Sequence, residues 1–313
     1  MPQLENLVFC GTPQFAVPTL EKLVEAGFNV RLVLTQPDRP KGRGLGLVAS
    51  PVKQTALRLG LPVYQPEKIK ENAELRARLD EIAPAAIIVV GYGRIIPGWM
   101  LQLPKHGNIN LHASLLPKYR GAAPIQWAIA NGEPVTGVTT MRIDEGLDTG
   151  DILLQKELAI LDEDTAETLS PRLSASGAEL MIETLRGLAE ATISPQPQKN
   201  DQATLAPILK KEDGRIDFSR SVQEIYNRLR GFQPWPGAFT TFRGKTLNIT
   251  AAKPSVEVVP QSQLLARDNR IFVGCGNATA LELLEVQPEG KKRISVRDFI
   301  HGYRPQAGEK VGE

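Results

Sequence analysis

Short apolar runs alternate with amphipathic stretches from the start of the chain to about residue 190. Short apolar runs predict buried strands, and apolar positions that recur every three to four residues predict helices. The predicted strands are 7–10, 30–35, 62–64, 85–90, 109–111 and 135–141, and the predicted helices are 14–26, 52–59, 72–82 and 165–189. The run 85–90 is apolar on both faces, as a central parallel strand is. The alternation therefore predicts an α/β fold: a doubly wound, mainly parallel sheet with right-handed crossovers.

The pattern changes beyond residue 191. Residues 192–207 carry Pro195, Pro197 and Pro207 among polar side chains, a composition that suits a semi-extended linker. A short helix is expected at 222–230, and strands at 239–242, 246–252, 271–273 and 281–286. Several short strands predict a small β-barrel, of which the OB type is the common nucleic-acid-binding example, but propensity alone does not separate a barrel from a sandwich. The expected division is therefore 1–191, 192–207 and 208–313.

Composition places the chain among ordinary globular proteins. It has 313 residues, 42% of them hydrophobic and 23% charged, enough to bury the cores of two domains. No apolar run approaches the roughly 20 residues of a membrane span, and residues 1–6 do not resemble a signal peptide. We expect a cytoplasmic protein with no membrane partner. Cys10 and Cys275 do not suggest a disulfide, and no Cys or His cluster has metal-ligand spacing.

The net charge of +2 is unevenly distributed. Residues 1–206 carry 20 Lys and Arg against 23 Asp and Glu, a balance of −3, whereas residues 207–313 carry 17 against 12, a balance of +5. Ordinary variation of a solvated surface explains this difference as readily as function does. A basic C-terminal third nevertheless fits a polyanionic partner better than a small neutral one.

The chemistry is expected around Asn110-Leu111-His112, which is followed by Ala113-Ser114-Leu115-Leu116-Pro117. A strand that ends here places Asn110 and His112, two positions apart, on one face of the sheet. One amide and one imidazole then point into a common pocket. A lone histidine beside a strand is more often structural than catalytic, so position alone does not assign it a role.

Two loops that contain glycine follow predicted strands. The acidic segment 144–151 allows close approach of its backbone, and its carboxylates can orient or charge an imidazole. Gly91-Tyr92-Gly93 follows the strand 85–90 and, by itself, is equally a tight turn. Because ligands of such sheets bind beyond the carboxyl ends of the strands, both loops are expected to converge with His112 on one crevice.

The first predicted strand leads into Gly11-Thr12-Pro13 and then a helix. This arrangement invites a dinucleotide-binding interpretation. The Gly-x-Gly-x-x-Gly pattern, which lets a pyrophosphate approach the start of a helix, is absent here. The sequence therefore argues against a nicotinamide dehydrogenase.

A long loop, residues 36–50, connects the second predicted strand to the next helix. Its three glycines and two prolines disfavour a helix, and Arg39, Lys41 and Arg43 outnumber Asp38. A flexible solvated insertion explains this composition as well as a binding role does. As a binding element, a mobile basic loop would follow a phosphate backbone and wedge an arginine into a nucleic-acid end.

Together these segments resemble the formyltransferase family that uses 10-formyltetrahydrofolate. The Asn-x-His, Ser-Leu-Leu-Pro and Leu-Asp-Thr-Gly segments match the catalytic signature of that family, and their shared order is more specific than any one of them. The basic loop, Arg228-Leu229-Arg230-Gly231 and Pro234-Trp235-Pro236-Gly237 are similar to those of the members that formylate methionine on initiator tRNA. The resemblance covers nearly the whole chain and implies an OB-like C-terminal barrel.

The resemblance also implies a role for each site residue. Asn110 and His112 would donate hydrogen bonds to the oxyanion that forms when the amine of methionine attacks the formyl carbon. Asp148 would fix the histidine tautomer and favour its charged form, or take the amine proton through water. Folate contacts are expected from Gly91, Tyr92, Gly93, Ser114, Leu115, Leu116 and Pro117, and tRNA contacts from Arg39, Lys41 and Arg43.

The co-substrate implied is 10-formyltetrahydrofolate, and the partner implied is initiator methionyl-tRNA. No metal and no covalent intermediate is required. We expect a monomer.

Three other functions fit parts of the sequence. A formyltransferase that acts on an amino sugar nucleotide, a ribonucleotide or another small amine would keep the site and change the acceptor. A 10-formyltetrahydrofolate hydrolase would use water in place of the amine. A non-catalytic RNA-binding module would explain only the basic loop and the barrel, and the Asn-x-His and Leu-Asp-Thr-Gly segments argue against it.

Overall fold

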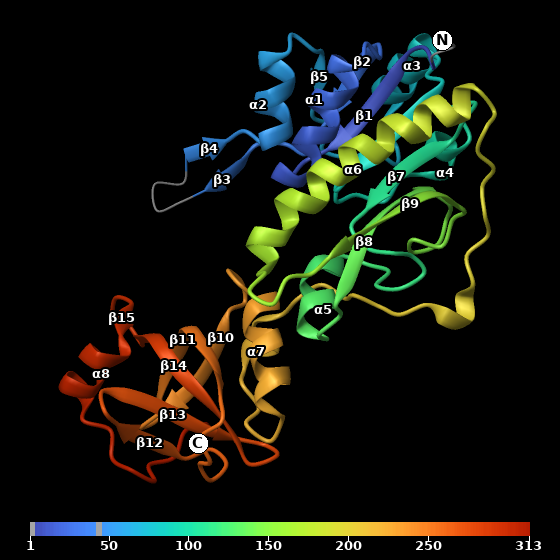
Figure 1. Ribbon diagram of the computed structural model, residues 1–313. Coiled ribbons are helices and arrows are strands. Elements are labelled where there is room, and N and C mark those ends of the chain that lie inside the picture. The colour runs from blue at the N-terminus through green and yellow to red at the C-terminus, as the bar shows by residue number, and fades with distance from the viewer. Residues whose placement is uncertain (1–3, 42–45) are drawn as a thin grey trace. The chain divides into compact units, whose positions relative to one another are not determined.

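The computed structural model of the protein describes residues 4–41 and 46–313, which form two compact units (Figure 1). The first unit comprises Met1–Pro124, Val135–Ala159 and Ser170–Ala206, and the second comprises Ile125–Pro134, Ile160–Leu169 and Pro207–Glu313. Two short segments that precede residue 170 thus belong by their contacts to the second unit. The division at 191 and 208 stays a prediction.

The first unit is built on a seven-stranded sheet of order β5-β2-β1-β6-β7-β8-β9. Its strands are β1 (Leu7–Gly11), β2 (Val30–Leu34), β5 (Val63–Tyr64), β6 (Ala86–Val90), β7 (Asn108–His112), β8 (Val135–Arg142) and β9 (Ile152–Ala159). The strands from β5 to β7 in this order are parallel, whereas β8 runs antiparallel to both β7 and β9. The strand order reverses between β1 and β6, so ligands are expected at the loops that follow these two strands.

Helices cover both faces of this sheet, with α1 and α6 on one face and α3 and α4 on the other (Figure 1). The helices of this unit are η1 (Gln14–Ala16), α1 (Val17–Glu25), α2 (Pro51–Arg58), α3 (Ala73–Ile82), α4 (Gly98–Leu101), η2 (Asn200–Gln202) and most of α6 (Ala166–Ala189). Leu75 and Leu79 of α3 pack in one buried apolar cluster with Val8 of β1. Helix α6 approaches β7 so closely at Gly177 that a Cβ there would lie 2.6 Å from Leu111.

The predicted fold class is confirmed, and the structure adds elements that the sequence pattern did not predict. Strand β9 was missed because its middle is exposed and polar, at Gln155, Lys156 and Glu157, as an edge strand often is. In the basic loop, β3 (Arg39–Lys41) pairs with β4 (Gly46–Val48) as a hairpin. Glycine and proline thus excluded a helix there but allowed strand pairing.

The second unit is an antiparallel sheet of order β10-β11-β14-β13-β12, with β15 paired to β14. Its strands are β10 (Ala238–Phe242), β11 (Lys245–Ser255), β12 (Leu264–Arg267), β13 (Arg270–Cys275), β14 (Thr279–Pro288) and β15 (Ile294–Ser295), and its helices are η3 (Lys211–Gly214), α7 (Val222–Gly231), α8 (Val296–Tyr303) and most of α5 (Pro124–Ala130). Val311 bridges to Phe242 at the end of β10, and Lys310 bridges to Gln263 beside β12. The C-terminal segment therefore links the two edges of the sheet, consistent with the predicted OB-like barrel.

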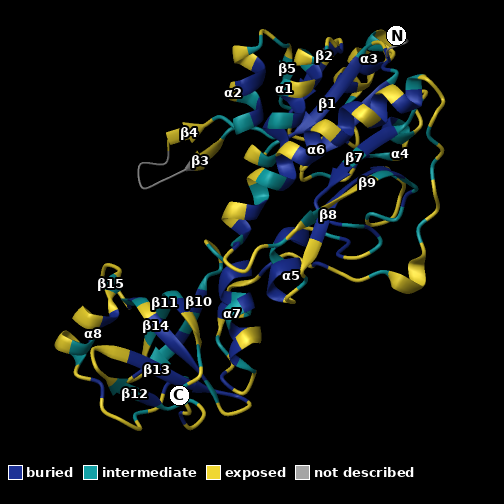
Figure 2. Cartoon of the chain, viewed as in Figure 1, coloured by how far each residue is buried: buried dark blue, intermediate teal, exposed yellow. Residues whose placement is uncertain are grey.

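A large apolar core lies within this unit, and Figure 2 shows where its buried residues lie along the strands and helices. Inward positions alternate along β10, where Ala238, Thr240 and Phe242 are buried. Phe242 packs against Phe299 of α8 with ring centroids 5.4 Å apart. This alternation is why short strands rather than helices form here.

Among the described residues, no helix is both long and apolar enough to cross a membrane. Cys10 and Cys275 are both buried and free. Burial raises the pKa of the Cys275 thiol to about 11, so this thiol stays protonated at neutral pH.

Candidate active site

His112 ends β7 and is buried, with 7% of its side chain exposed. Its Nε2 lies 2.9 Å from the carbonyl oxygen of Tyr119. A carbonyl only accepts hydrogen bonds, so this contact places a proton on Nε2. Nδ1 is therefore the ring nitrogen left for chemistry. Tyr119 reaches this position with φ of +61°, a left-handed conformation uncommon outside glycine.

Asp148 faces the other side of the same imidazole. Its Oδ2 lies 3.7 Å from Nδ1 of His112 and accepts a hydrogen bond of 2.8 Å from the backbone N–H of Gly121. The side chain of Asp148 is 20% exposed, so water reaches it. The structure thus brings together a histidine and an aspartate that lie 36 positions apart in the sequence, as the sequence predicted.

The geometric reason expected for this proximity was wrong. The loop that contains Asp148 was expected to lie beyond the carboxyl end of its strand, at the same edge of the sheet as His112. In the structure β8 runs antiparallel to β7, with Thr139 opposite His112 and Arg142 opposite Ile109. The carboxyl end of β8 therefore lies beside the start of β7, and the loop after β8 must fold back along the sheet to bring Asp148 to the imidazole.

Close packing shapes this returning loop. A Cβ on Gly150 would lie 2.0 Å from the carbonyl oxygen of Arg142, so only glycine fits. Asp144 accepts hydrogen bonds from the hydroxyl of Thr149 and from the N–H of Gly146. Asp148 itself has φ of +51°. Asp and Asn tolerate this left-handed conformation better than most residues, which fits an aspartate at this point.

Two asparagines on β7 have different environments. The amide of Asn108 is buried and donates to the carbonyl oxygens of Met100 and Leu101, at 2.9 and 3.2 Å, where α4 ends. The side chain of Asn110 is half-buried and makes no hydrogen bond to any residue in the described ranges 4–41 and 46–313. Asn110 and His112 share a strand face, so this uncommitted amide is available to a ligand beside the imidazole.

The turn after β6 lies at the point where the strand order reverses. Gly91 and Gly93 have φ of +56° and +74°, and both are exposed. The carbonyl oxygen of Tyr92 accepts hydrogen bonds from Thr12 and Gln36, which join this turn to the loops after β1 and β2. The ring of Tyr92 is buried in the cluster beneath the sheet, so only the backbone of this residue can face a ligand.

Residues 114–117 form a turn that supports the histidine. The hydroxyl of Ser114 donates to the carbonyl oxygen of Lys118, and its own carbonyl oxygen accepts from Thr139. Leu115 packs at Gly137, where a Cβ would lie 2.5 Å from its side chain, and Leu116 is buried. Pro117 follows a cis peptide bond. The side chains of Ser114 and Leu116 thus make contacts inside the protein. Any folate contact of this turn would therefore come from its backbone or from its edge.

The basic loop is described only in part. Arg39 is exposed at the start of β3, and Arg43 lies outside the described residues. Asp38 forms an ion pair with Lys53 at 2.6 Å and accepts a hydrogen bond from Gln65, and the Lys53 bond is the main reason that its pKa lies below the ordinary value. Because Lys53 already neutralises Asp38, that aspartate does not offset the charge of Arg39.

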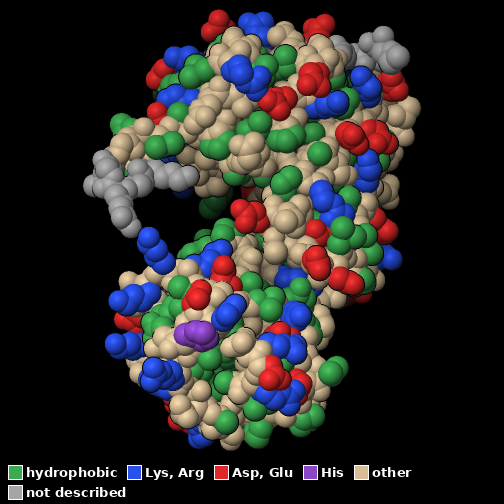
Figure 3. All heavy atoms as spheres, turned by 60° about the vertical axis from the view of Figure 1, so that its left-hand side comes forward, with side chains coloured by type: hydrophobic (Ala, Val, Ile, Leu, Met, Phe, Trp, Pro, Cys, Tyr) green, Lys and Arg blue, Asp and Glu red, His purple; other side chains and the backbone are tan. Residues whose placement is uncertain are grey.

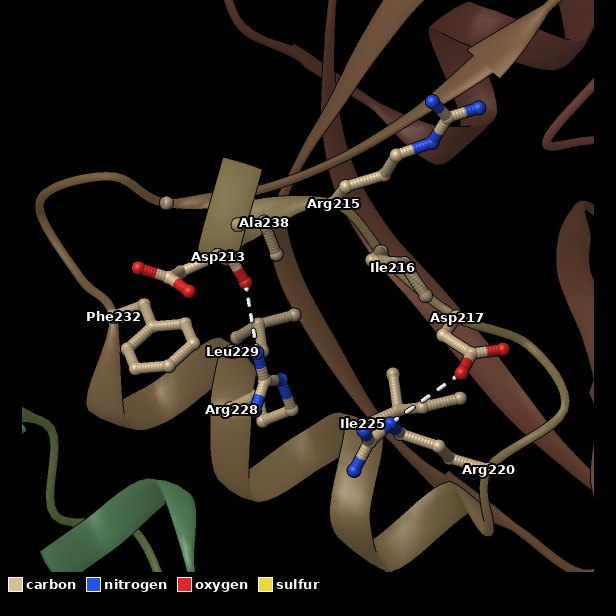
Figure 4. Close-up of a pocket in the computed structure, with 12 residues that line it drawn as sticks. Asp213, Arg215, Ile216, Asp217, Arg220, Ile225, Arg228, Leu229, Phe232 and Ala238 are labelled. Atoms are coloured by element: carbon tan, nitrogen blue, oxygen red, sulfur yellow. Dashed lines mark hydrogen bonds and ion pairs between the residues drawn. The ribbon is translucent and has the colours of Figure 1, made fainter. Parts of the chain in front are cut away.

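A small hollow in the second unit contains several charged side chains (Figure 4). Arg228 donates to the carbonyl oxygen of Asp213, and Arg220 pairs with Asp217 at 3.5 Å. The guanidinium of Arg228 also lies 4.8 Å from the ring centroid of Phe232. The hollow has a volume of about 10 Å³, room for a single water, so it holds neither a pterin nor a nucleotide.

Sequence reasoning missed three groups that shape the site. The Tyr119 carbonyl and the Gly121 N–H are backbone groups, to which residue type gives no clue. Gln198 donates hydrogen bonds to the carbonyl oxygens of Asp148 and Gly150, but the sequence offered only a polar residue in a proline-rich segment.

Within the described part of the chain, no group of three or more His, Cys, Asp or Glu side chains could hold a metal ion.

Comparisons with known proteins match both units. A family described as formyl transferase matches residues 5–185, and one described as formyl transferase, C-terminal domain, matches residues 208–304. The chain is 66% identical to the methionyl-tRNA formyltransferase of Koribacter versatilis, over 98% of each chain. It is 63% identical to the methionyl-tRNA formyltransferase of Acidobacterium capsulatum, over 95% of this chain and 96% of the relative.

Solved structures show a similar fold at low identity. An N-formyltransferase from Helicobacter canadensis, in complex with folinic acid and dTDP-3-aminofucose, superposes with a TM-score of 0.67. The similarity covers 91% of this chain and 100% of that one, at 20% sequence identity. At this identity the similarity concerns the fold and not the acceptor.

Proposed function

Because the chain belongs to the formyl transferase family, we propose that it transfers the formyl group of 10-formyltetrahydrofolate to the α-amine of methionine on initiator methionyl-tRNA, a step in translation initiation. The observation that carries this proposal is the 66% identity to a methionyl-tRNA formyltransferase over 98% of both chains. The similarity includes the second unit, which is matched by the family described as formyl transferase, C-terminal domain.

The chemistry of the transfer assigns a task to each group of the site. When the amine attacks the formyl carbon, negative charge develops on the formyl oxygen, and hydrogen-bond donors must face it. We assign the Asn110 amide as one donor, since it makes no bond within the described part of the protein. We assign Nδ1–H of His112 as the other, because Nε2 is occupied by the Tyr119 carbonyl.

The bond between the formyl carbon and N10 of the folate must then break, so the attacking nitrogen loses one proton and N10 gains one. Asp148 is the proposed acceptor, through a water molecule, because its carboxylate is partly exposed and lies 3.7 Å from Nδ1 of His112. The Gly121 N–H, at 2.8 Å from Oδ2, keeps the carboxylate at this side of the ring.

The folate would bind where the strand order reverses, against the backbone of Gly91, Tyr92 and Gly93 and against residues 114–117. The positive φ angles and exposure of the two glycines support this assignment, because they let a flat ring approach the backbone. Ile95, 91% exposed just after this turn, adds an apolar surface that a pterin or benzoyl ring would cover.

The tRNA would be bound by cationic side chains of both units. In the first unit these are Arg39, Lys41 and Arg43 of the basic loop. In the second unit, Lys and Arg side chains gather on one face (Figure 3), and the exposed basic residues of the β14–β15 turn and α8 are Lys291, Lys292, Arg293, Arg297 and Arg304. This supports counterion release as the main source of tRNA affinity. We further propose a cytoplasmic monomer.

One assay with the full-length chain tests the function. Formyl transfer from 10-formyltetrahydrofolate is measured with charged initiator tRNA, charged elongator methionine tRNA, free methionine and a dTDP-amino sugar as acceptors, and formate release is measured without any acceptor. We expect efficient transfer to charged initiator tRNA only. Transfer to the amino sugar without tRNA, or formate release that does not depend on an acceptor, would replace this proposal with one of the alternatives.

A further inference from the structure

Residues 196–206, within the segment that composition suggests is an interdomain linker, are hydrogen-bonded along the active-site loops of the first unit. The N–H of Arg120 donates to the carbonyl oxygen of Thr204 at 2.9 Å, and the N–H of Ala206 donates to the carbonyl oxygen of Arg120 at 2.7 Å. The N–H of Tyr119, whose carbonyl holds His112, donates to the hydroxyl of Thr204. This segment therefore holds the loop on one side of the imidazole.

The same segment also reaches the loop on the other side of the imidazole, through one side chain. The Nε2 group of Gln198 donates to the carbonyl oxygens of Asp148 and Gly150, at 2.8 and 2.7 Å. The Oε1 atom of Gln198 accepts two hydrogen bonds from the guanidinium of Arg120, at 3.1 and 2.7 Å. One amide thus connects the two loops that flank His112.

Arg120 determines which way this amide points. Its guanidinium is buried and has only donors, so the amide must turn its oxygen toward Arg120 and its NH₂ group toward the Asp148 loop. Asn200 accepts a further hydrogen bond from Arg120 at 2.8 Å, which fixes the guanidinium. The amide therefore has one stable orientation, in which both of its hydrogens bind the loop.

We infer that Gln198 is a positioning residue for catalysis: it holds the Asp148 loop so that the carboxylate faces Nδ1 of His112. Asp148 has φ of +51°, a conformation that is uncommon outside glycine, and the two hydrogen bonds from Gln198 hold the backbone on both sides of Thr149. Without the two hydrogen bonds to its carbonyls, the loop can relax and turn the carboxylate away from the ring. The expected effect on kcat rests on the proposed function, whereas the expected effect on the geometry at His112 does not.

The variant that tests it is Gln198→Glu. A carboxylate keeps the acceptor for Arg120, so the segment stays attached, but it cannot donate to the two loop carbonyls and repels them. We expect kcat for formyl transfer to fall at least tenfold, with KM for the folate and the tRNA changed less than twofold. Gln198→Met, which removes donor and acceptor, should show the same loss of kcat. Gln196→Met is the matched control, because that side chain is exposed and its one hydrogen bond to a described residue is to the carbonyl oxygen of Ser194 beside it.

Two readouts separate positioning from a purely structural role. In an Asp148→Asn background, Gln198→Glu should have no further effect on kcat, since both changes remove the same carboxylate from the ring. The nitrogen chemical shifts of His112, one of only three histidines, should move in Gln198→Glu in the direction seen in Asp148→Asn and stay unchanged in Gln196→Met. This second readout needs no substrate.

These measurements test the positioning role of Gln198 and the proposed function separately. Unchanged His112 shifts and unchanged kcat in Gln198→Glu would overturn the inference, and so would kcat losses that simply add to those of Asp148→Asn. A wild-type protein that transfers no formyl group to any charged tRNA, but whose His112 shifts respond to Gln198→Glu, would overturn the proposed function and leave the positioning role in place.

Discussion

The imidazole Nε2 of His112 lies 2.9 Å from the carbonyl oxygen of Tyr119, and this contact decides which ring nitrogen takes part in the chemistry. A carbonyl cannot donate, so Nε2 carries a proton and Nδ1 faces Asp148. A backbone oxygen thereby sets the protonation pattern of the candidate catalytic histidine.

The first prediction concerns the charge of Asp148. Asp148→Asn keeps a residue that tolerates φ of +51° and keeps an oxygen for the Gly121 N–H, but removes the negative charge beside Nδ1. Turnover should fall by roughly 10²–10⁴-fold, the usual contribution of a general acid or base, with the melting temperature nearly unchanged. Glu145→Gln removes an equal charge from an exposed position of the same loop and should leave kcat unchanged. Equal losses in both variants would point to a general effect of loop charge.

The second prediction separates the two asparagines of β7. Asn110→Ala removes an uncommitted amide and should lower kcat by about 10²–10³-fold, as loss of an oxyanion donor does, with little change in stability. Asn108→Ala removes two hydrogen bonds to the end of α4 and should lower the free energy of unfolding by about 1–3 kcal/mol while the folded fraction keeps most of its activity. Steady-state kinetics and urea unfolding measure the two effects. A stability loss in Asn110→Ala with normal turnover would show that the roles are exchanged.

The third prediction concerns Arg43, whose proposed role in tRNA binding comes from the resemblance of the basic loop. Arg43→Ala should lower kcat/KM for charged initiator tRNA strongly, reduce the dependence of log KM on log salt by about one unit, and leave KM for the folate unchanged. Arg31→Ala, at an exposed position near the amino end of β2, is the matched control. A salt series measured on both variants checks this. Parallel behaviour of the two variants at every salt concentration would leave the basic loop a solvated insertion.

The fourth prediction concerns the stability of the second unit in acid. Glu282 is buried on β14 and accepts two hydrogen bonds from Arg270, at 2.8 and 2.6 Å, which lower its pKa below the ordinary value of 4.5. Because the folded pKa is depressed, this stabilisation is complete above about pH 4.5 and is lost as the pH falls through the folded pKa. Glu282→Gln should therefore cost about 1–3 kcal/mol of unfolding free energy at pH 7 and flatten the loss of stability below pH 4.5.

Unfolding by urea at a series of pH values checks this prediction. Glu313→Gln is a suitable control, since that carboxylate pairs with Lys310 at the exposed end of the chain. A pH dependence of the Glu282→Gln protein that matches the wild type would mean that other carboxylates control acid unfolding.

The sequence by itself determined most of the elements of the first unit and one face of the site. Apolar runs such as 86–90 predict buried strands, and the amphipathic stretches between them predict α1, α2, α3 and α6, whereas the polar edge strand β9 carries no such signal. The two-residue period of a strand places Asn110 and His112 on one face whatever packs around them. These features depend on local chain geometry, which residue type controls.

The tertiary structure alone decided how the site closes around His112. The antiparallel direction of β8, which a single strand pattern does not reveal, makes the Asp148 loop fold back rather than extend from the sheet edge. Positions 108 and 110 both carry asparagine. Only their surroundings show that the Asn108 amide is buried and bonded to the end of α4, whereas the Asn110 amide is available to a ligand. The groups that hold His112 and Asp148 are a carbonyl, an N–H and the amide of Gln198, which approach from segments up to 86 positions away. Such contacts depend on where distant backbone segments meet in space, and the residue type at one position does not predict where they meet.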